Sequence, residues 1–163
     1  MRSVAEAAGV SQGALLHHFP DKNALILAAI EQALTLARDD SSSWLEVEAK
    51  DAKSVLETML AEFRAFFFSD RFWVAIGMTL DATKDPAFSP HVRATVAGLR
   101  TPIYEAWVER LAAMGWERGA AVRTVRSGAA LVSGAAVRRF WAEPDAVSED
   151  VEADWLADRL RAL

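Results

Sequence analysis

The sequence predicts an all-α protein. Apolar residues recur at spacings of three and four along nearly the whole chain, which is the period of an amphipathic helix. Short runs of Gly, Pro, Asp and Ser separate these segments, as turns between helices would. The only run that favours a β-strand is short and lies inside a helical pattern, and no glycine-rich phosphate-binding motif or internal repeat is present.

Length, composition and charge limit the kinds of protein that this chain can be. A length of 163 residues fits one domain, or one compact domain with a small appendage, and 52% hydrophobic residues can fill a core. The absence of cysteine excludes disulfides and thiolate chemistry. The longest apolar run, residues 72–80, is far shorter than the ~20 residues of a membrane span, so we expect a cytoplasmic protein with no membrane partner. The net charge of −5 means that any nucleic-acid site must be local.

The first two predicted helices, residues 3–8 and 11–19, are joined by a tight turn. Gly9 can adopt a positive φ, so it ends the first helix and begins the turn, and Val10 is expected to plug the space beneath it. Ser11 is a good N-cap, whose hydroxyl can accept from the amide of Ala14.

The second helix has two distinct faces. Leu15 and Phe19 are four residues apart and should point inward, and Pro20 ends the helix. The outer face then carries Gln12, Gly13, Leu16 and His17. Two short helices joined by a glycine turn form a helix-turn-helix, in which the second helix enters the major groove of DNA.

The third predicted helix, residues 21–38, is capped by Asp21 and ends at the polar stretch DDSSSW, residues 39–44. Its expected inner stripe is Leu25, Ala28, Ala29, Gln32 and Leu36. Lys22 in the first turn opposes the helix dipole, which becomes favourable if a phosphate binds there. The alternative is an ordinary solvated lysine.

Helices are also predicted over residues 51–69, 72–82, 91–114, 117–141 and 148–163. Pro102 lies within the third of these, so the helix either kinks there or restarts with Thr101 as its N-cap. Ser148 is the expected cap of the last helix.

Aromatic and thioether side chains gather in the middle of the chain and are predicted to line a cavity for a hydrophobic small molecule. This set is Met59, Phe63, Phe66, Phe67, Phe72, Trp73, Met78 and Trp107. The alternative is that they are ordinary core residues. No lone charge within the set marks a polar group of the ligand.

No cofactor, metal or enzymatic activity is expected. Adjacent residues on a helix project about 100° apart, so His17 and His18 cannot chelate one ion together. No arrangement of nucleophile, base and carboxylate stands out.

The last two helices are predicted to form a dimer interface. Residues 128–136, GAALVSGAA, are small enough for close helix packing, and the closing helix has one apolar side. The expected contacts are Ala129, Val132, Ala136, Phe140, Trp155, Leu156 and Leu160. Packing within one chain is the alternative.

The stretch VAEAAGVSQGALLHHFPDKNAL, residues 4–25, resembles the DNA-binding region of tetracycline-repressor-like (TetR) regulators. Their pattern runs roughly I/V-A-x-x-A-G-V-S-x-G-T-L-Y-x-H-F-x-x-K-x-x-L. The combination of AGVS, the HF pair and K-x-x-L is specific, whereas the rest of the chain fits only as an all-helical ligand-binding and dimerisation body.

The resemblance implies a homodimer that binds a near-palindromic operator in double-stranded DNA and releases it when a small molecule binds. It divides the chain into a helix-turn-helix head with its connecting helix, residues 1–38, and an antiparallel helical body, residues 39–163, that binds the effector and dimerises. The implied DNA contacts are Ser11, Gln12, Gly13, Ala14, Leu16, His17, His18 and Lys22.

The sequence departs from the family pattern in three places. Leu16 replaces the usual Tyr and Ala14 the usual Thr or Ser, so two backbone contacts to DNA are lost. The family's first helix, which covers the motif, is also missing, and we expect a truncated chain, a misassigned start or further preceding residues. The runner-up function is a helical ligand-binding or interaction protein of the same fold that no longer binds DNA.

Overall fold

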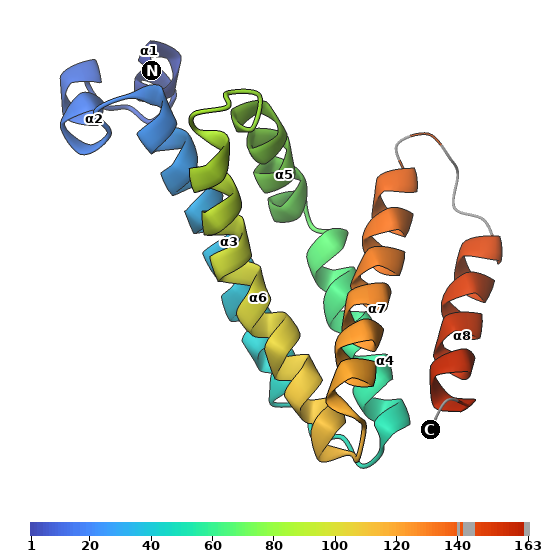
Figure 1. Ribbon diagram of the computed structural model, residues 1–163. Helices are drawn as coiled ribbons and strands as arrows, with labels where there is room; N and C mark the ends of the chain where they lie inside the picture. The colour runs from blue at the N-terminus through green and yellow to red at the C-terminus, as the bar shows by residue number, and fades with distance from the viewer. Residues whose placement is uncertain (140, 142–145, 162–163) are drawn as a thin grey trace.

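The computed structural model describes residues 1–139, 141 and 146–161. Within them the chain forms eight α-helices and no strand, which confirms the all-α prediction. The helices are α1 (Arg2–Ala7), α2 (Gln12–His18), α3 (Lys22–Leu45), α4 (Ala52–Phe67), α5 (Asp70–Ala82), α6 (Ser89–Ala113), α7 (Arg118–Arg138) and α8 (Ala146–Arg161). Figure 1 shows α1 and α2 at one end of a bundle formed by the other helices.

Side-chain caps begin most of these helices at the residues that precede them. Ser11 Oγ accepts a hydrogen bond from the Ala14 amide at 3.1 Å, and Asp21 Oδ1 accepts from the Ala24 amide at 2.8 Å, as predicted for both caps. Asp51 and Ser54 form a reciprocal capping box at the start of α4. Local sequence therefore fixes where α2, α3 and α4 begin.

The predicted break at residues 39–44 is wrong, because α3 continues through it to Leu45. Asp and Ser cost only up to about 0.7 kcal/mol each inside a helix, and packing can offset this. Trp44 and Leu45 pack against the core, and Arg110 of α6 donates to the carbonyl oxygens of both, at 3.3 and 2.7 Å. The predicted boundary between residues 38 and 39 therefore falls inside one continuous helix.

The inner face of α3 also differs from the prediction. Ile30, Leu34 and Ala37 are buried, whereas Gln32 is exposed and Leu36 is 40% exposed. The i, i+3 and i+4 pattern holds, but the face is rotated toward Ile30, Leu34 and Ala37, which pack into the core of the bundle.

Two other helix boundaries are settled by the structure. Helix α6 runs without interruption through Pro102, so the restart at Thr101 is wrong. Helix α8 begins at Ala146, so Ser148 lies within the helix rather than at its cap. The predicted ends of the other body helices agree with the structure to within two residues, except that α7 ends at Arg138, three residues before the predicted end. A difference of one or two residues is the usual uncertainty of a helix end.

The core lies in the bundle of α3 to α8. Helices α3 and α6 run side by side, and α7 packs against α4 and α6 on the other side (Figure 1). Trp107, Phe63 and Leu56 are among the largest fully buried side chains. The last helix, α8, packs against α4 and α7. Among the described residues, no helix combines the length and apolar character that crossing a membrane requires.

Candidate DNA-binding face and effector cavity

The turn between α1 and α2 has the predicted backbone geometry. Gly9 has a φ of +68°, which favours glycine, and the Val10 amide donates to the Ala5 carbonyl oxygen at 3.0 Å. Ala5 and Leu15 are buried where the two helices meet. Val10 is 46% exposed, so its predicted role as a plug is wrong, and the buried apolar residues beneath the turn are Ala5 and Leu15.

All the predicted DNA contacts lie on the surface. The exposed residues are Ser11, Gln12, Gly13, Ala14, Leu16, His17, His18 and Lys22. Leu15 is buried and Phe19 is half-buried on the opposite side of α2, as predicted. The helix therefore presents one polar face to solvent and one apolar face to α1.

The rest of the chain leaves this face open. Helices α1 and α2 pack against each other, and no Cα atom of either lies within 8 Å of a Cα atom in helices α3 to α8. At Gly13 an added Cβ atom would meet only Ser11 Oγ, at 3.9 Å. The protein's own packing thus gives no reason for a glycine at this position, although glycine weakens a helix.

Lys22 has a carboxylate in its surroundings. Asp81, at the end of α5, accepts a hydrogen bond from Lys84 Nζ at 3.0 Å. This bond first, and the positive charges of Lys84 and Lys22 next, hold the pKa of the Asp81 carboxyl below its ordinary value. The first turn of α3 is therefore electrostatically coupled to the end of α5.

Two adjacent histidines lie at the end of α2. The rings of His17 and His18 meet edge to face, with centroids 5.5 Å apart. In the part of the chain that the structure describes, no three His, Asp or Glu side chains come together in a way that could hold a metal ion.

A cavity of about 140 Å³ lies where α3, α4, α5 and α6 meet. Its lining is Leu34, Phe66, Phe67, Phe72, Ala75, Ile76, Thr79, Val96, Arg100 and Tyr104. Because it touches α3, the helix that leads to the head, a ligand in this cavity would contact the connection between body and head.

The predicted effector residues fall into two groups. Phe66, Phe67 and Phe72 line the cavity, and their ring centroids lie 5.0 to 5.4 Å from one another. The others do not line it: Met59, Phe63 and Trp107 are fully buried core residues, and Trp73 and Met78 are half-buried. For these five the alternative of ordinary core packing agrees with the structure.

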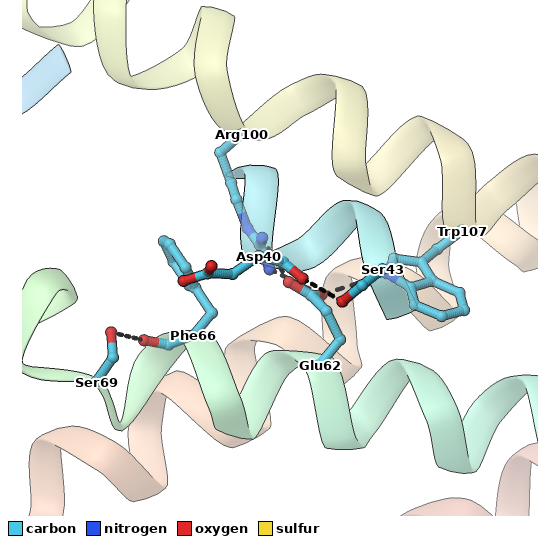
Figure 2. A network of polar contacts seen from close by, with 7 residues as sticks. All are labelled: Asp40, Ser43, Glu62, Phe66, Ser69, Arg100 and Trp107. Carbon is cyan, nitrogen blue, oxygen red and sulfur yellow. Dashed lines mark hydrogen bonds and ion pairs between the residues drawn. The ribbon is translucent and has the colours of Figure 1, made fainter. Parts of the chain in front are cut away.

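A buried ion pair lies beside the cavity, which the sequence analysis missed. Arg100 Nη1 and Nη2 donate to Glu62 Oε1 and Oε2 at 2.8 and 3.2 Å, and Trp107 Nε1 donates to Glu62 Oε2 at 3.3 Å. Figure 2 shows Arg100 and Trp107 of α6 reaching toward Glu62 of α4. Glu62 is 1% exposed and Arg100 8%. The two charges are paired with each other, so neither is a lone charge of the kind that would mark a polar group of the ligand.

Helical spacing contained a signal for this pair. Glu62 lies three residues after Met59 and four before Phe66, on the buried stripe of α4. Arg100 lies four after Val96 and four before Tyr104. A charged residue within an apolar stripe is rarely buried without an oppositely charged partner. Glu62 on one helix and Arg100 on another therefore predict an ion pair between them.

A second hollow, of about 300 Å³, is also lined by Phe66. Asp40, Glu62, Ser69, Asp70 and Arg71 supply most of its polar lining. An ion pair joins Asp40 to Arg71, and Ser69 Oγ donates to the Phe66 carbonyl oxygen at 2.7 Å (Figure 2 shows Asp40 and Ser69). Phe66 thus lines both this hollow and the apolar cavity.

The predicted dimer contacts mostly face their own protomer. Ala129, Val132 and Ala136 are buried in the core, and Phe140 lies outside the described residues. Trp155, Leu156 and Leu160 are half-buried against that core. Trp155 Nε1 donates to Ser127 Oγ at 3.1 Å, and its ring lies over Gly128, which has no side chain to obstruct it.

A different face of α7 is open and apolar. It forms one wall of a hollow of about 650 Å³. Ala130, Gly134 and Val137 of α7 and Trp141, three residues beyond its end, follow one another at spacings of three and four, and all are exposed, Trp141 by 70%. Val151 of α8 lies on the same hollow and is 44% exposed. The small residues of α7 therefore lie on two faces of the helix, one packed against the core and one exposed to solvent.

Comparisons with known proteins agree with this geometry. The model of a family described as bacterial regulatory proteins, tetR family, matches residues 1–29. The HTH-type transcriptional regulator CymR of Pseudomonas putida is 33% identical over 138 residues, which cover 85% of this chain and 68% of that protein. No solved structure gives a significant match. The residues matched by the family model include all of α1 and α2.

Proposed function

Because the chain belongs to the tetR family of bacterial regulatory proteins, we propose that it binds a near-palindromic operator as a homodimer. A small apolar molecule in the α3–α6 cavity then releases the DNA. The observation that carries this proposal is the open polar face of α2, which no other part of the described chain covers. Since its target is DNA, the proposal places the protein in the cytoplasm.

The N-terminal half of α2 would read base edges in the major groove. Gln12 has the donor and acceptor pair that recognises adenine, and Leu16 can contact a thymine methyl group. His17 and Lys22 would bind phosphates, with Ser11, Gly13, Ala14 and His18 at the edge of the contact. Gly13 would let the helix backbone approach the DNA closely.

Dimerisation would use the exposed face of α7 rather than its buried one. Ala130 and Gly134 are small enough to allow close approach of a second copy, and Trp141 and Val151 would be buried by it. A two-fold axis at this face would pair α7 and α8 of each protomer into a four-helix interface.

Helix α3 would transmit ligand binding to the head. It carries Leu34 in the cavity wall, and its far end is held by Arg110, which donates to three carbonyl oxygens, those of Trp44, Leu45 and Val47. A helix held at one end and pushed in the middle moves most at its other end, where the head is attached. Operator half-sites lie about 34 Å apart, so a shift of a few ångströms would prevent both heads from docking. Release requires that the effector bind the DNA-free state more tightly.

A gel-shift with the DNA upstream of the protein's own gene tests the proposal. We expect a shifted complex that weakens steeply as salt rises, because phosphate contacts release counterions. The matched variant is Gln12→Ala, which removes one exposed side chain of α2 without touching the core, and it should weaken the complex. The absence of any shift at low salt would contradict operator binding.

One observation favours the second candidate, a family member that does not bind DNA. The net charge is −5, and Arg2 and Lys22 are the only Lys or Arg residues among the first 37. If this candidate is right, the same gel-shift gives no complex, whereas a ligand still binds in the body.

A further inference from the structure

We propose that the effector is a neutral molecule built on a single hydrocarbon ring, and that the Glu62–Arg100 ion pair excludes ligands that carry a charge. This inference rests on the proposed function, since it names the chemical class of the effector for the same cavity.

The volume of the cavity sets the size of the ligand. At about 140 Å³ it is smaller than the roughly 300–1,000 Å³ of sites for drug-sized ligands. It is close to an engineered cavity of about 150 Å³, lined by Leu, Ile and Phe, that stays dry and binds benzene. A molecule of one ring with few substituents is therefore the size that fits.

The lining sets the polarity of the ligand. Apart from Thr79, Arg100 and Tyr104, every lining side chain is a hydrocarbon. The rings of Phe66, Phe67 and Phe72 form a cluster, in which Phe66–Phe67 and Phe67–Phe72 meet edge to face. An added aromatic ring can join such a cluster in the same offset or edge-to-face geometry.

The charge of Arg100 is already balanced before a ligand enters. Both of its Nη atoms donate to the Glu62 carboxylate, at 2.8 and 3.2 Å, and the guanidinium carbon lies 4.1 Å from the centre of the Phe66 ring. Arg100 lines the cavity and Glu62 does not, so a ligand meets a guanidinium whose charge is already neutralised by Glu62.

Either sign of charge on the ligand would disturb this balance. A carboxylate would add a second negative charge beside Glu62, or displace Glu62 and leave a buried carboxylate without its cation. An ammonium would meet the guanidinium, which has the same sign. A neutral ring keeps the pair intact, and so avoids the cost of burying an unbalanced charge.

Calorimetry on the full chain at pH 7 tests the proposal with three probes of similar shape: toluene, benzoate and benzylammonium. We expect toluene to bind, and the two charged probes to bind at least about tenfold more weakly. Benzoate or benzylammonium binding as tightly as toluene would overturn the proposal. So would the absence of toluene binding up to its solubility limit.

Two variants test the role of the pair and the place of the site. Glu62→Gln keeps the shape and an acceptor for the Trp107 indole but removes the charge, so the affinity for benzoate should rise about tenfold over wild type. Glu57→Gln is the matched control: it lies on the same helix, is exposed, and should change nothing. Ala75→Phe fills the cavity, since Ala75 is a lining residue that is 2% exposed, and should abolish toluene binding.

The outcomes remain separable. A folded Glu62→Gln protein, judged by its helical circular dichroism, whose benzoate affinity equals that of wild type would overturn the role of the ion pair. If this variant does not fold, the binding of the three probes to the wild-type protein decides whether the cavity excludes charged ligands. Because no DNA is present, a failure of operator binding does not alter the calorimetric result, and a failure of toluene binding leaves the gel-shift unaffected.

Discussion

At the scale of single residues, the head contains a residue whose identity is not explained by packing within the protein. This residue is Gly13, which lies in a helix, where glycine is unfavourable. An added Cβ atom at Gly13 would make only an ordinary contact with Ser11. The residue is explained if the backbone of α2 approaches something outside the protein.

Gly13→Ala should therefore separate stability from DNA binding. The variant should be no less stable than wild type, because alanine favours the helix by about 1 kcal/mol, while operator affinity should fall about tenfold. Gly98→Ala is the matched control, since Gly98 lies inside α6 with open space around it. The control should leave operator affinity unchanged, and an equal loss in both variants would contradict a close approach at Gly13.

Lys22 gives a second prediction at this scale, through the salt dependence of binding. If each copy of Lys22 neutralises one phosphate, Lys22→Ala should reduce the slope of log affinity against log salt by about 0.9 per subunit. Anisotropy titrations with operator DNA at several salt concentrations measure this slope. An unchanged slope would mean that Lys22 acts only on Asp81 and its neighbours.

At the scale of helices, the proposal assigns folding to one face of α7 and dimer assembly to the other. Trp155 of α8 packs on Gly128 of α7 inside the protomer, whereas Trp141 is 70% exposed on the outer side. Trp155→Ala should lower the free energy of unfolding by about 2–3 kcal/mol, as removal of a partly buried aromatic side chain does. Trp141→Ala should instead weaken the dimer.

Denaturant unfolding and sedimentation at matched protein concentrations distinguish these effects. If Trp141→Ala unfolds as easily as Trp155→Ala but sediments like wild type, the outer face of α7 is not the interface.

The start of α4 gives a prediction about pH. The Ser54 amide and hydroxyl, which bond to Asp51, hold the pKa of the Asp51 carboxyl below its ordinary value of 3.8. A lowered pKa in the folded state means stability that is fully present above pH 3.8 and lost as the pH falls through the folded value. The difference in stability between wild type and Asp51→Ala should thus be full at pH 7 and shrink below pH 3.8, as chemical denaturation would measure. A constant difference would contradict the cap.

How far the sequence predicts the structure also differs between helices. Local sequence signals were enough to predict the turn and the helix starts of the head, because Gly9, Ser11 and Asp21 act on neighbours three or four residues away. Local signals failed to predict that α3 continues through residues 39–44. The end of this helix is stabilised by hydrogen bonds from Arg110, which lies more than sixty residues later in the chain. Spacing alone identified α7 as a packing helix, but it could not show that Ala129 and Val132 face inward while Ala130 and Gly134 face outward.

At the scale of the whole molecule, an acidic protein is proposed to bind DNA through a small, locally exposed surface. A net charge of −5 per chain provides no general attraction to DNA, so affinity must come from the geometry of two heads that dock together. The proposed effector cavity lies in the body and includes Leu34 of α3 in its wall, so in this proposal the DNA-bound and DNA-free states differ in how α3 places the head.

Hydroxyl-radical footprinting of the dimer on the DNA upstream of its own gene tests the central claim most directly. The account predicts two protected segments with centres about 34 Å apart, or a multiple of that distance, which disappear together when toluene is added. A single protected segment, or protection that Gln12→Ala does not weaken, would contradict the claim that the exposed face of α2 reads the operator.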